Sequence, residues 1–204
     1  MNNGEFFCLY CNKPLVKKPL KKTKCSHCGN FLYVRTKNSK QEVVSETEAK
    51  RLDALKDLSG YGITELDYSK HKEVLAKRFG KEPNYHDVIW SLYNDLIIRG
   101  SNNFQTLNSI YYQMALFLRD EGKPYNDILR LKHKMDLLEY QQSNVIIGVD
   151  IDTSACCSKC RPLNRKEFSI EAALEEKLLP YEKCEGFCMC CYLPLTELSK
   201  PTRT

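Results

Sequence analysis

Apolar positions recur at intervals of three and four residues through the middle of the chain, from Ser45 to Tyr140. This spacing puts them on one face of an α-helix, so it predicts a series of amphipathic helices. Glycines and a Gly-Lys-Pro turn interrupt the pattern and separate one helix from the next. The predicted helices are Ser45–Leu58, Leu66–Phe79, one opened by Pro83-Asn84 and closed by Gly100, Phe104–Asp120, and Tyr125–Tyr140.

The two ends of the chain show strand patterns instead. Residues 6–35 should form a small antiparallel sheet, in which Phe31–Val34 is a strand of β-branched and aromatic residues. Residues 36–45 are polar, and we expect a linker there. Near the other end, Val145–Asp152 is the clearest strand, and a short helix is predicted from Ile170 to Leu179.

Two Cys-x-x-Cys pairs lie in the first thirty residues, separated by thirteen residues. Such a pair forms a tight knuckle that points two thiolates at one ion, and two knuckles complete the four-sulfur site that structural zinc prefers. Gly29 follows the second knuckle, where a sharply turning backbone favours a residue that tolerates positive φ. The sequence therefore predicts a zinc ribbon with the ligands Cys8, Cys11, Cys25 and Cys28.

A second cysteine group lies near the C-terminus. Cys157 and Cys160 form another knuckle, and two of the four later cysteines would complete a second zinc site. The alternative is a redox or nucleophilic thiol, because Lys159, Arg161 and Lys183 would lower a thiolate pKa. The candidate ligands after the knuckle are Cys184, Cys188, Cys190 and Cys191.

Composition restricts the setting of these sites. The chain has 204 residues, 28% of them charged, and no apolar run approaches the roughly 18 residues of a membrane span. Met1–Glu5 is polar and lacks the apolar core of a secretory signal. Eleven cysteines, mostly in close pairs, favour metal ligation in a reducing compartment over a disulfide framework, so we expect a cytoplasmic protein.

The positive charge is concentrated in the ribbon. Residues 12–41 hold nine basic side chains and no acid, whereas residues 42–156 carry a net charge of −4 and residues 157–191 are neutral. A polyanionic partner is therefore expected at the ribbon, where Tyr10, Phe31 and Tyr33 could add a surface for stacking bases. The candidate nucleic-acid contacts are Lys13, Lys17, Lys18, Lys21, Lys22, Lys24, Arg35 and Lys37.

These patterns predict a mainly α protein with small β elements. A basic zinc ribbon would occupy residues 1–40, a helical bundle residues 41–142, and a strand-plus-helix zinc module residues 143–204. The bundle and the C-terminal module are the expected docking surfaces for a protein partner, since neither carries the excess of basic charge that nucleic acid requires.

Three functions remain open. The first is nucleic-acid docking through the ribbon, by electrostatics and without chemistry. The second is a protein-only adaptor or inhibitor in phage assembly or phage–host conflict. The third is a metal-dependent nuclease, which is the less favoured because its acids have no recognisable spacing. Its candidate residues are Asp150, Asp152, Glu171, Glu175 and Lys177.

The last stretch resembles the C-terminal cysteine motif of Mu-type phage head-morphogenesis (minor capsid) proteins. The resemblance rests on Cys157-Ser-Lys-Cys160, on Lys166-Glu-Phe168, on Leu178-Leu179-Pro180 and on Cys188-Met-Cys190. That family usually has His-Pro before its last cysteine pair, where this chain has Glu182-Lys183-Cys184. The whole layout also resembles a group of zinc-ribbon proteins of bacteria and phages. Together these resemblances imply a phage or defence context.

Overall fold

The computed structural model describes residues 6–37 and 39–199, so the polar segment Met1–Glu5 lies outside it. Its internal contacts divide the chain into two compact units, one reaching to Leu92 and one starting at Tyr93. The division falls inside a helix, so the single bundle expected over residues 41–142 is not confirmed. We describe each unit by itself.

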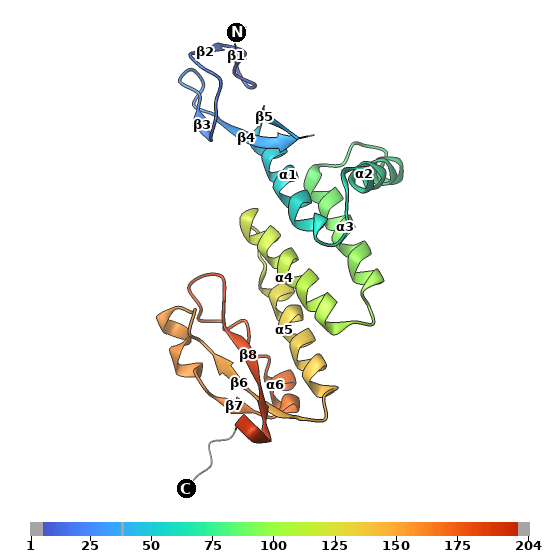
Figure 1. Cartoon of the computed structure of the whole chain (residues 1–204), viewed down its shortest axis with the longest axis vertical. Helices are drawn as coiled ribbons and strands as arrows, with labels where there is room; N and C mark the ends of the chain where they lie inside the picture. Colours follow the sequence, from blue (N-terminus) through green and yellow to red (C-terminus); the bar gives the residue numbers. More distant parts are fainter. Residues whose placement is uncertain (1–5, 38, 200–204) are drawn as a thin grey trace. The chain divides into compact units, whose positions relative to one another are not determined.

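Unit 1 begins with short strands and continues into helices (Figure 1). The helices begin where polar side chains cap them: Ser45 accepts a hydrogen bond from the backbone N–H of Glu48, and Thr64 forms a capping box with Asp67. The elements are β1 (Phe6–Phe7), β2 (Pro14–Leu15), β3 (Thr23–Lys24), β4 (Phe31–Lys37), β5 (Lys40–Val44), α1 (Glu46–Ser59), α2 (Glu65–Phe79) and the first part of α3 (Tyr85–Arg99).

The linker expected over residues 36–45 is wrong, because most of this segment belongs to an antiparallel hairpin. β4 and β5 pair from Tyr33 opposite Val44 to Lys37 opposite Lys40. Val44 is buried, whereas Lys40, Gln41 and Glu42 are exposed. The hairpin therefore buries only its end nearest α1, and its exposed polar residues resemble a linker in the sequence.

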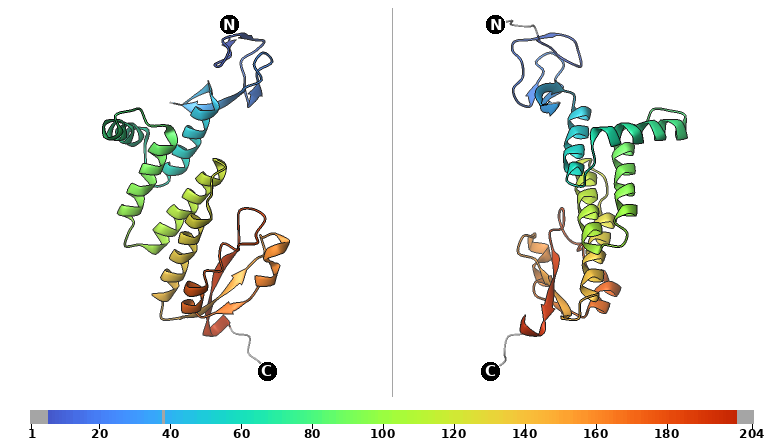
Figure 2. Two further views of the ribbon diagram at one scale, coloured as in Figure 1. Left: turned by 180° about the vertical axis from the view of Figure 1, so that it is seen from behind. Right: turned by 45° about the vertical axis from the view of Figure 1, so that its right-hand side comes forward.

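Unit 2 combines a helical hairpin with a three-stranded antiparallel sheet. α4 and α5 lie side by side in both orientations of the ribbon, and Asn108 of α4 donates hydrogen bonds to Asp136 and to the carbonyl of Lys132 on α5 (Figure 2). The sheet order is β7-β6-β8. The elements are the rest of α3, α4 (Phe104–Asp120), α5 (Asn126–Gln141), β6 (Ile146–Asp152), the 3-10 helix η1 (Ser158–Leu163), β7 (Glu167–Phe168), α6 (Ile170–Glu176), β8 (Cys191–Thr196) and the 3-10 helix η2 (Glu197–Ser199).

The core of unit 2 lies between its sheet and its helices. Val149 and Ile151 of β6 are fully buried, and they belong to the same cluster as Leu129 and Leu137 of α5. Three cysteines, Cys160, Cys188 and Cys190, belong to this buried cluster as well. Three of the candidate C-terminal ligands are therefore embedded in the hydrophobic core.

α6 is shorter than the helix predicted from Ile170 to Leu179, because it ends at Glu176. Lys177 adopts a left-handed conformation with φ of 50° and stops the helix. Leu179 precedes Pro180, and a residue before proline disfavours helical geometry. The chain is thereby redirected toward the segment that carries the last cysteines.

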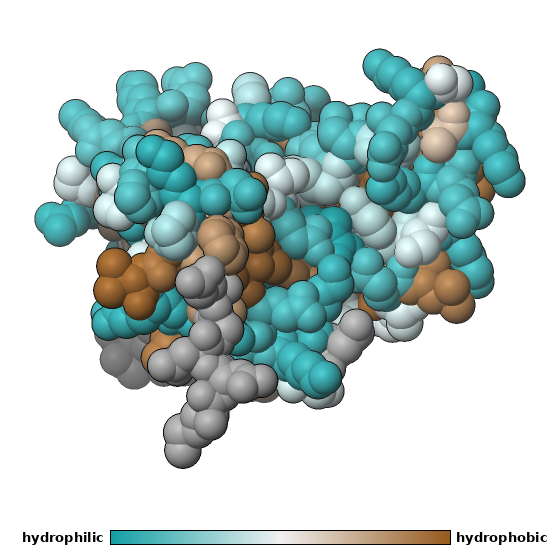
Figure 3. Space-filling model, turned by 90° about the horizontal axis from the view of Figure 1, so that it is seen from above, coloured by the Kyte–Doolittle hydropathy of each residue, from teal (hydrophilic) through white to brown (hydrophobic). Residues whose placement is uncertain are grey.

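Within the part of the chain that the structure describes, no helix has both the length and the apolarity to cross a membrane. Figure 3 shows one face, on which hydrophilic side chains form most of the surface and small hydrophobic patches lie between them. Among the described residues helices predominate and the sheets are small, as the sequence predicted.

Candidate metal centres and basic surface

The two N-terminal knuckles have the same backbone geometry. In the first, the Cys8 carbonyl accepts from the N–H of Asn12, and in the second the Cys25 carbonyl accepts from the N–H of Gly29. Both Asn12 and Gly29 have positive φ, of 52° and 75°. The requirement for left-handed backbone explains these two residues, because glycine and asparagine adopt it most easily.

The knuckles bring four thiols together. Cys8 Sγ lies 3.7 Å from Cys28 Sγ, and Cys11 Sγ lies 3.9 Å from Cys25 Sγ. All four sulfurs lie within 4.8 Å of one another. A tetrahedral ion with metal–sulfur bonds of about 2.3 Å has sulfur–sulfur edges of about 3.8 Å. The four predicted ligands are therefore spaced to hold one metal ion.

Backbone N–H groups prepare one of these thiols for ligation. The N–H of His27 donates to Cys25 Sγ at 3.4 Å, and that of Tyr10 donates to Cys8 Sγ at 3.5 Å. Hydrogen bonds from the N–H groups of Cys28 and His27 lower the pKa of Cys25 to about 6. Cys25 thus favours the thiolate form, which is the form that binds metals.

The C-terminal cysteines come from separate turns around the sheet. Cys156 lies in the turn after β6, Cys157 and Cys160 lie at the start of η1, and Cys190 immediately precedes β8. Cys184 follows a turn in which its N–H donates to the carbonyl of Tyr181. β6 and β8 are antiparallel partners, with Ile146 opposite Thr196 at one end and Asp152 opposite Cys191 at the other. The turn that follows β6 therefore lies next to the segment that precedes β8.

These thiols form two groups of potential ligands, each within 4.8 Å. One group contains Cys157, Cys160 and Cys184, and the other contains Cys156, Cys160 and Cys190. In the first, Cys157 Sγ lies 3.7 Å from Cys160 Sγ and 3.9 Å from Cys184 Sγ. These distances again match the edges of a tetrahedral sulfur site.

The sequence missed Cys156, because the Cys-x-x-Cys pattern draws attention to its neighbour Cys157. The adjacent cysteine pair was the available signal. Cys188 and Cys191 belong to neither group of three, although Cys188 is buried in the same cluster as Cys160 and Cys190. Burial raises the pKa of Cys191, and Asp152, Lys132, Asp136 and Cys156 act on it by charge.

The lysines between the knuckles are the main feature of the ribbon surface. All six are exposed, and within residues 6–37 and 39–199 they form no ion pair. The ammonium of Lys22 lies 4.6 Å from the centroid of the Phe31 ring and 4.9 Å from that of Tyr33, and Lys18 lies 5.2 Å from that of Phe6. Positive charge and aromatic faces therefore occur together on this surface.

The other two basic candidates are engaged within unit 1. Arg35 forms an ion pair with Asp53 of α1 at 2.7 Å, and Lys37 forms one with Glu48 at 3.4 Å. The hydroxyl of Tyr10 accepts a hydrogen bond from the N–H of Glu46. These contacts attach the ribbon and the β4–β5 hairpin to the first turns of α1.

The acids of the nuclease hypothesis lie in different surroundings. Asp150 is buried and paired with Arg165 at 2.9 Å, while Asp152 accepts hydrogen bonds from Ser154. The backbone and hydroxyl of Ser154 lower the pKa of Asp152. Glu171 and Glu175 lie on α6, and Lys177 ends it. Among the described residues, no group of three potential metal ligands includes an acid.

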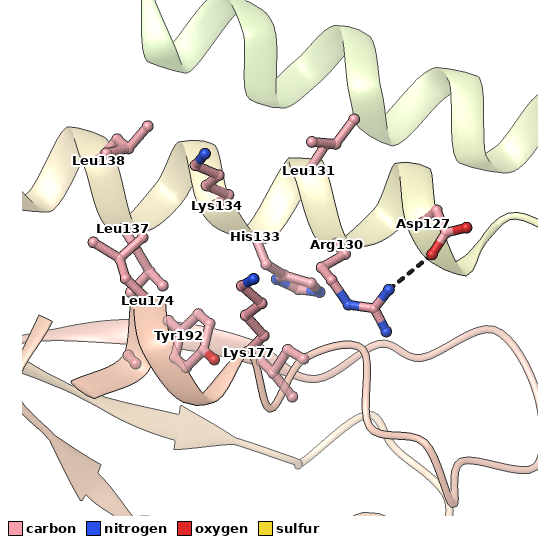
Figure 4. Close-up of a pocket in the computed structure, with 12 residues that line it drawn as sticks. Asp127, Arg130, Leu131, His133, Lys134, Leu137, Leu138, Leu174, Lys177 and Tyr192 are labelled. Carbon is pink, nitrogen blue, oxygen red and sulfur yellow. Dashed lines mark hydrogen bonds and ion pairs between the residues drawn. The ribbon is translucent and has the colours of Figure 1, made fainter. Parts of the chain in front are cut away.

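Unit 2 also contains a cavity of about 480 Å³ between α5, α6 and β8. Leucines of α5 and α6 line it, together with the cations Arg130, Lys134 and Lys177 and the acid Asp127 (Figure 4). His133 is buried in this wall, edge-on to the ring of Tyr192, and its Nε2 has no hydrogen-bond partner among the described residues. Burial lowers the pKa of His133 and keeps the imidazole neutral.

Comparison with known proteins adds no family assignment. No family model matches the sequence, and no curated protein or solved structure is significantly similar to it.

Proposed function

We propose that this chain is a zinc-binding protein that docks on nucleic acid through its basic N-terminal ribbon. The observation that carries the proposal is the set of six exposed lysines between the two knuckles, which make no ion pair among the described residues. In this view the metal holds the loop that presents the lysines, and the protein performs no chemistry on its partner.

Zinc is the metal that the cysteine groups favour. Four thiolates at tetrahedral spacing select zinc or iron among the common metals, and a closed four-sulfur site is typical of structural zinc. Among the described residues, the buried cluster at the centre of the ribbon contains Cys8, Cys25 and Leu32, with few side chains packed around them. A core of this size does not fold by burial alone, so the ion would supply the stability of the ribbon.

Docking would follow from counterion release. Each lysine that neutralises a phosphate frees condensed cations, so affinity falls as salt concentration rises. The rings of Phe31 and Tyr33 offer faces for unpaired bases, and Lys22 already lies over both rings. Arg35 and Lys37 would contribute less, because acids of α1 already hold them.

The rest of the chain would contact a protein. Residues 42–156 carry a net charge of −4, which disfavours nucleic acid there. The resemblance of the C-terminal cysteine segment to phage head-morphogenesis proteins supports a phage or defence setting for that partner. A cytoplasmic location fits a protein whose thiols must stay reduced to hold metal.

The decisive experiment is a salt titration of binding to short DNA and RNA. The test variant replaces Lys17, Lys18, Lys21 and Lys22 with glutamine. The matched control removes the same charge outside the ribbon. It replaces four exposed lysines that lie in or next to helices α1 and α2: Lys56, Lys70, Lys77 and Lys81. For duplex DNA, the test variant should lower the slope of log affinity against log salt by up to about 3.6, whereas the control keeps the slope. Equal slopes in all three proteins would overturn the proposal.

One observation favours a protein-only adaptor as the second candidate. Val16 and Leu20, in the lysine-rich loop, are exposed by 104% and 79%, and apolar side chains of this kind are common at protein interfaces. The adaptor predicts a complex that survives high salt and ignores nucleic acid. Zinc-loaded protein that binds neither DNA nor RNA would support this alternative, and a pull-down would then seek the partner.

A further inference from the structure

We propose that the C-terminal module holds two metal ions in one six-thiolate cluster, with Cys160 and Cys188 each bridging both ions. The proposal rests on zinc binding by this module, but it is independent of nucleic-acid docking by the ribbon. It differs from the site predicted from the sequence, which has one ion and four ligands.

The first ion position is defined by Cys157, Cys160 and Cys184. The sulfur distances from Cys157, 3.7 Å to Cys160 and 3.9 Å to Cys184, equal the edges of a tetrahedron around one ion. Three sulfurs occupy three corners of that tetrahedron. The fourth ligand must come from the neighbouring thiols.

The second position is defined by Cys156, Cys160 and Cys190, whose sulfurs also lie within 4.8 Å of one another. Cys156 Sγ and Cys190 Sγ are 2.9 Å apart, which is closer than the edge of about 3.8 Å that a shared ion imposes. Ion binding would therefore separate these two sulfurs by about 0.9 Å. Cys156 lies in a turn and is only partly buried, so a rotation of its side chain would supply this separation.

Cys160 belongs to both groups, which makes it the first bridge. Its side chain is completely buried. Its sulfur lies within 4.8 Å of those of Cys157 and Cys184 in one group and of those of Cys156 and Cys190 in the other. A thiolate has more than one lone pair, so a single sulfur can bind two ions at once. No other described residue is shared by two groups of potential ligands.

Cys188 is the second bridge. It is 3% exposed and belongs to the same buried cluster as Cys160 and Cys190. Its sulfur lies outside both groups of three, so ion binding would draw it toward the two positions. Two four-coordinate ions need about eight ligand positions, and six thiolates supply eight when two of them are shared. Each ion then has two terminal and two bridging sulfurs.

Charge balance is acceptable for such a cluster. Six thiols release six protons as they bind, and two divalent cations leave a net charge of −2, the same as one ion with four thiolates. No electron transfer is involved. Cys191 stays outside, because it belongs neither to the two groups of potential ligands nor to the buried cluster that contains Cys160, Cys188 and Cys190. It is therefore a matched control for substitutions within the cluster.

Native mass spectrometry of the zinc-loaded full chain tests the stoichiometry. We expect three ions per chain, one in the ribbon and two in the C-terminal module. Cys156→Ser and Cys190→Ser should each hold two, whereas Cys191→Ser should keep three. Two ions in the unaltered protein would overturn the proposal, whatever the variants do, and so would three ions in both Cys156→Ser and Cys190→Ser.

Cadmium provides a test that needs no variant. In the ¹¹³Cd-substituted protein, a bridging cysteine transfers magnetisation from its β-protons to two cadmium resonances, and a terminal cysteine to one. Cys160 and Cys188 should each correlate with two cadmium nuclei. A single cadmium partner for Cys160, or a disulfide between Cys156 and Cys190 in the metal-loaded protein, would contradict the bridged cluster. Loss of nucleic-acid binding would leave this result unaffected.

Discussion

The guanidinium of Arg35 donates hydrogen bonds to both carboxylate oxygens of Asp53, each at 2.7 Å. This fork connects the hairpin strand β4 to helix α1, and it divides the basic residues of the N-terminal region into two kinds. Arg35 serves the attachment of the hairpin, while the lysines between the knuckles stay available to a partner. The division leads to a first prediction.

Arg35→Gln and Lys22→Gln remove the same charge but should act differently. We expect Arg35→Gln to cost about 0.5 kcal/mol of stability, because partly exposed ion pairs contribute little, and to leave nucleic-acid affinity within about twofold. Lys22→Gln should leave stability unchanged and weaken binding several-fold at low salt. Urea unfolding and fluorescence anisotropy would measure the two effects. A larger loss of affinity in Arg35→Gln would show that the arginine leaves Asp53 to reach phosphate.

Removing the ion of the ribbon should unfold the ribbon alone. In Cys25→Ser one of four metal ligands is lost, and a small module of this kind depends on its metal for folding. We expect the amides of residues 6–34 to lose hydrogen-exchange protection and nucleic-acid binding to disappear. The helices of unit 1 should keep their protection, because their contacts include the buried side chains of Leu55, Leu58 and Val88. Cys191→Ser is the control, and an equally protected ribbon in Cys25→Ser would contradict metal-dependent folding.

Gly148 is required by the close approach of β6 and β7. A Cβ built at this position would lie 2.7 Å from the carbonyl oxygen of Phe168, and that neighbour is backbone. Gly148→Ala should therefore cost about 1–3 kcal/mol, as overpacked sites do. Gly60→Ala is the control, since its Cβ would lie at an ordinary 3.6 Å from the carbonyl oxygen of Asp57. Urea unfolding followed by circular dichroism measures both, and equal stability of the two variants would contradict the steric argument.

His133 should make unit 2 sensitive to acid. Its folded pKa is lowered by burial, so the unfolded chain takes up a proton at higher pH than the folded one. Stability is therefore complete above the ordinary histidine pKa of 6.5 and falls as the pH drops below it. Asp136 opposes the shift and Lys132 reinforces it, while Tyr192 contacts the ring from β8 and Arg130, Lys134 and Lys177 line the same cavity.

His133→Leu removes this titration while keeping an apolar side chain of similar size. We expect the unaltered protein to lose more stability between pH 7.5 and 5.5 than the variant does. Acid also protonates the cysteine ligands, but that loss is common to both proteins and cancels in the comparison. Guanidinium unfolding at the two pH values measures the difference. An equal loss in both proteins would assign the acid sensitivity elsewhere.

Local patterns were enough to predict most of the elements and the first candidate metal centre. Ser45 starts a helix where the sequence predicted one, because a capping side chain satisfies an N–H group only three residues away. The second helix was predicted from Leu66 and begins one residue earlier, at Glu65, where Thr64 caps it. Cys8, Cys11, Cys25 and Cys28 converge as predicted, because each knuckle is a short local turn that orients two sulfurs by itself.

Two of the predictions failed, each for its own physical reason. The β4–β5 hairpin was mistaken for a linker because its polar side chains face water. In the structure Val44 pairs with Tyr33 and is buried, so one end of the hairpin packs against the rest of unit 1. α6 stops early because Lys177 turns left-handed before Pro180, where a helical pattern alone continues. In each case packing or backbone geometry outweighed the periodicity of the residues.

The amino-acid sequence by itself determined the helices, the basic ribbon and the four-thiol spacing of its centre, because these arise from interactions over a few residues. Only the tertiary structure decided which C-terminal thiols meet. Cys156 and Cys190 are 34 positions apart, and the antiparallel pairing of β6 with β8 brings them together while directing Cys191 toward Asp152. Spacing cannot encode that choice, because it depends on strand register and on which side chains the core buries.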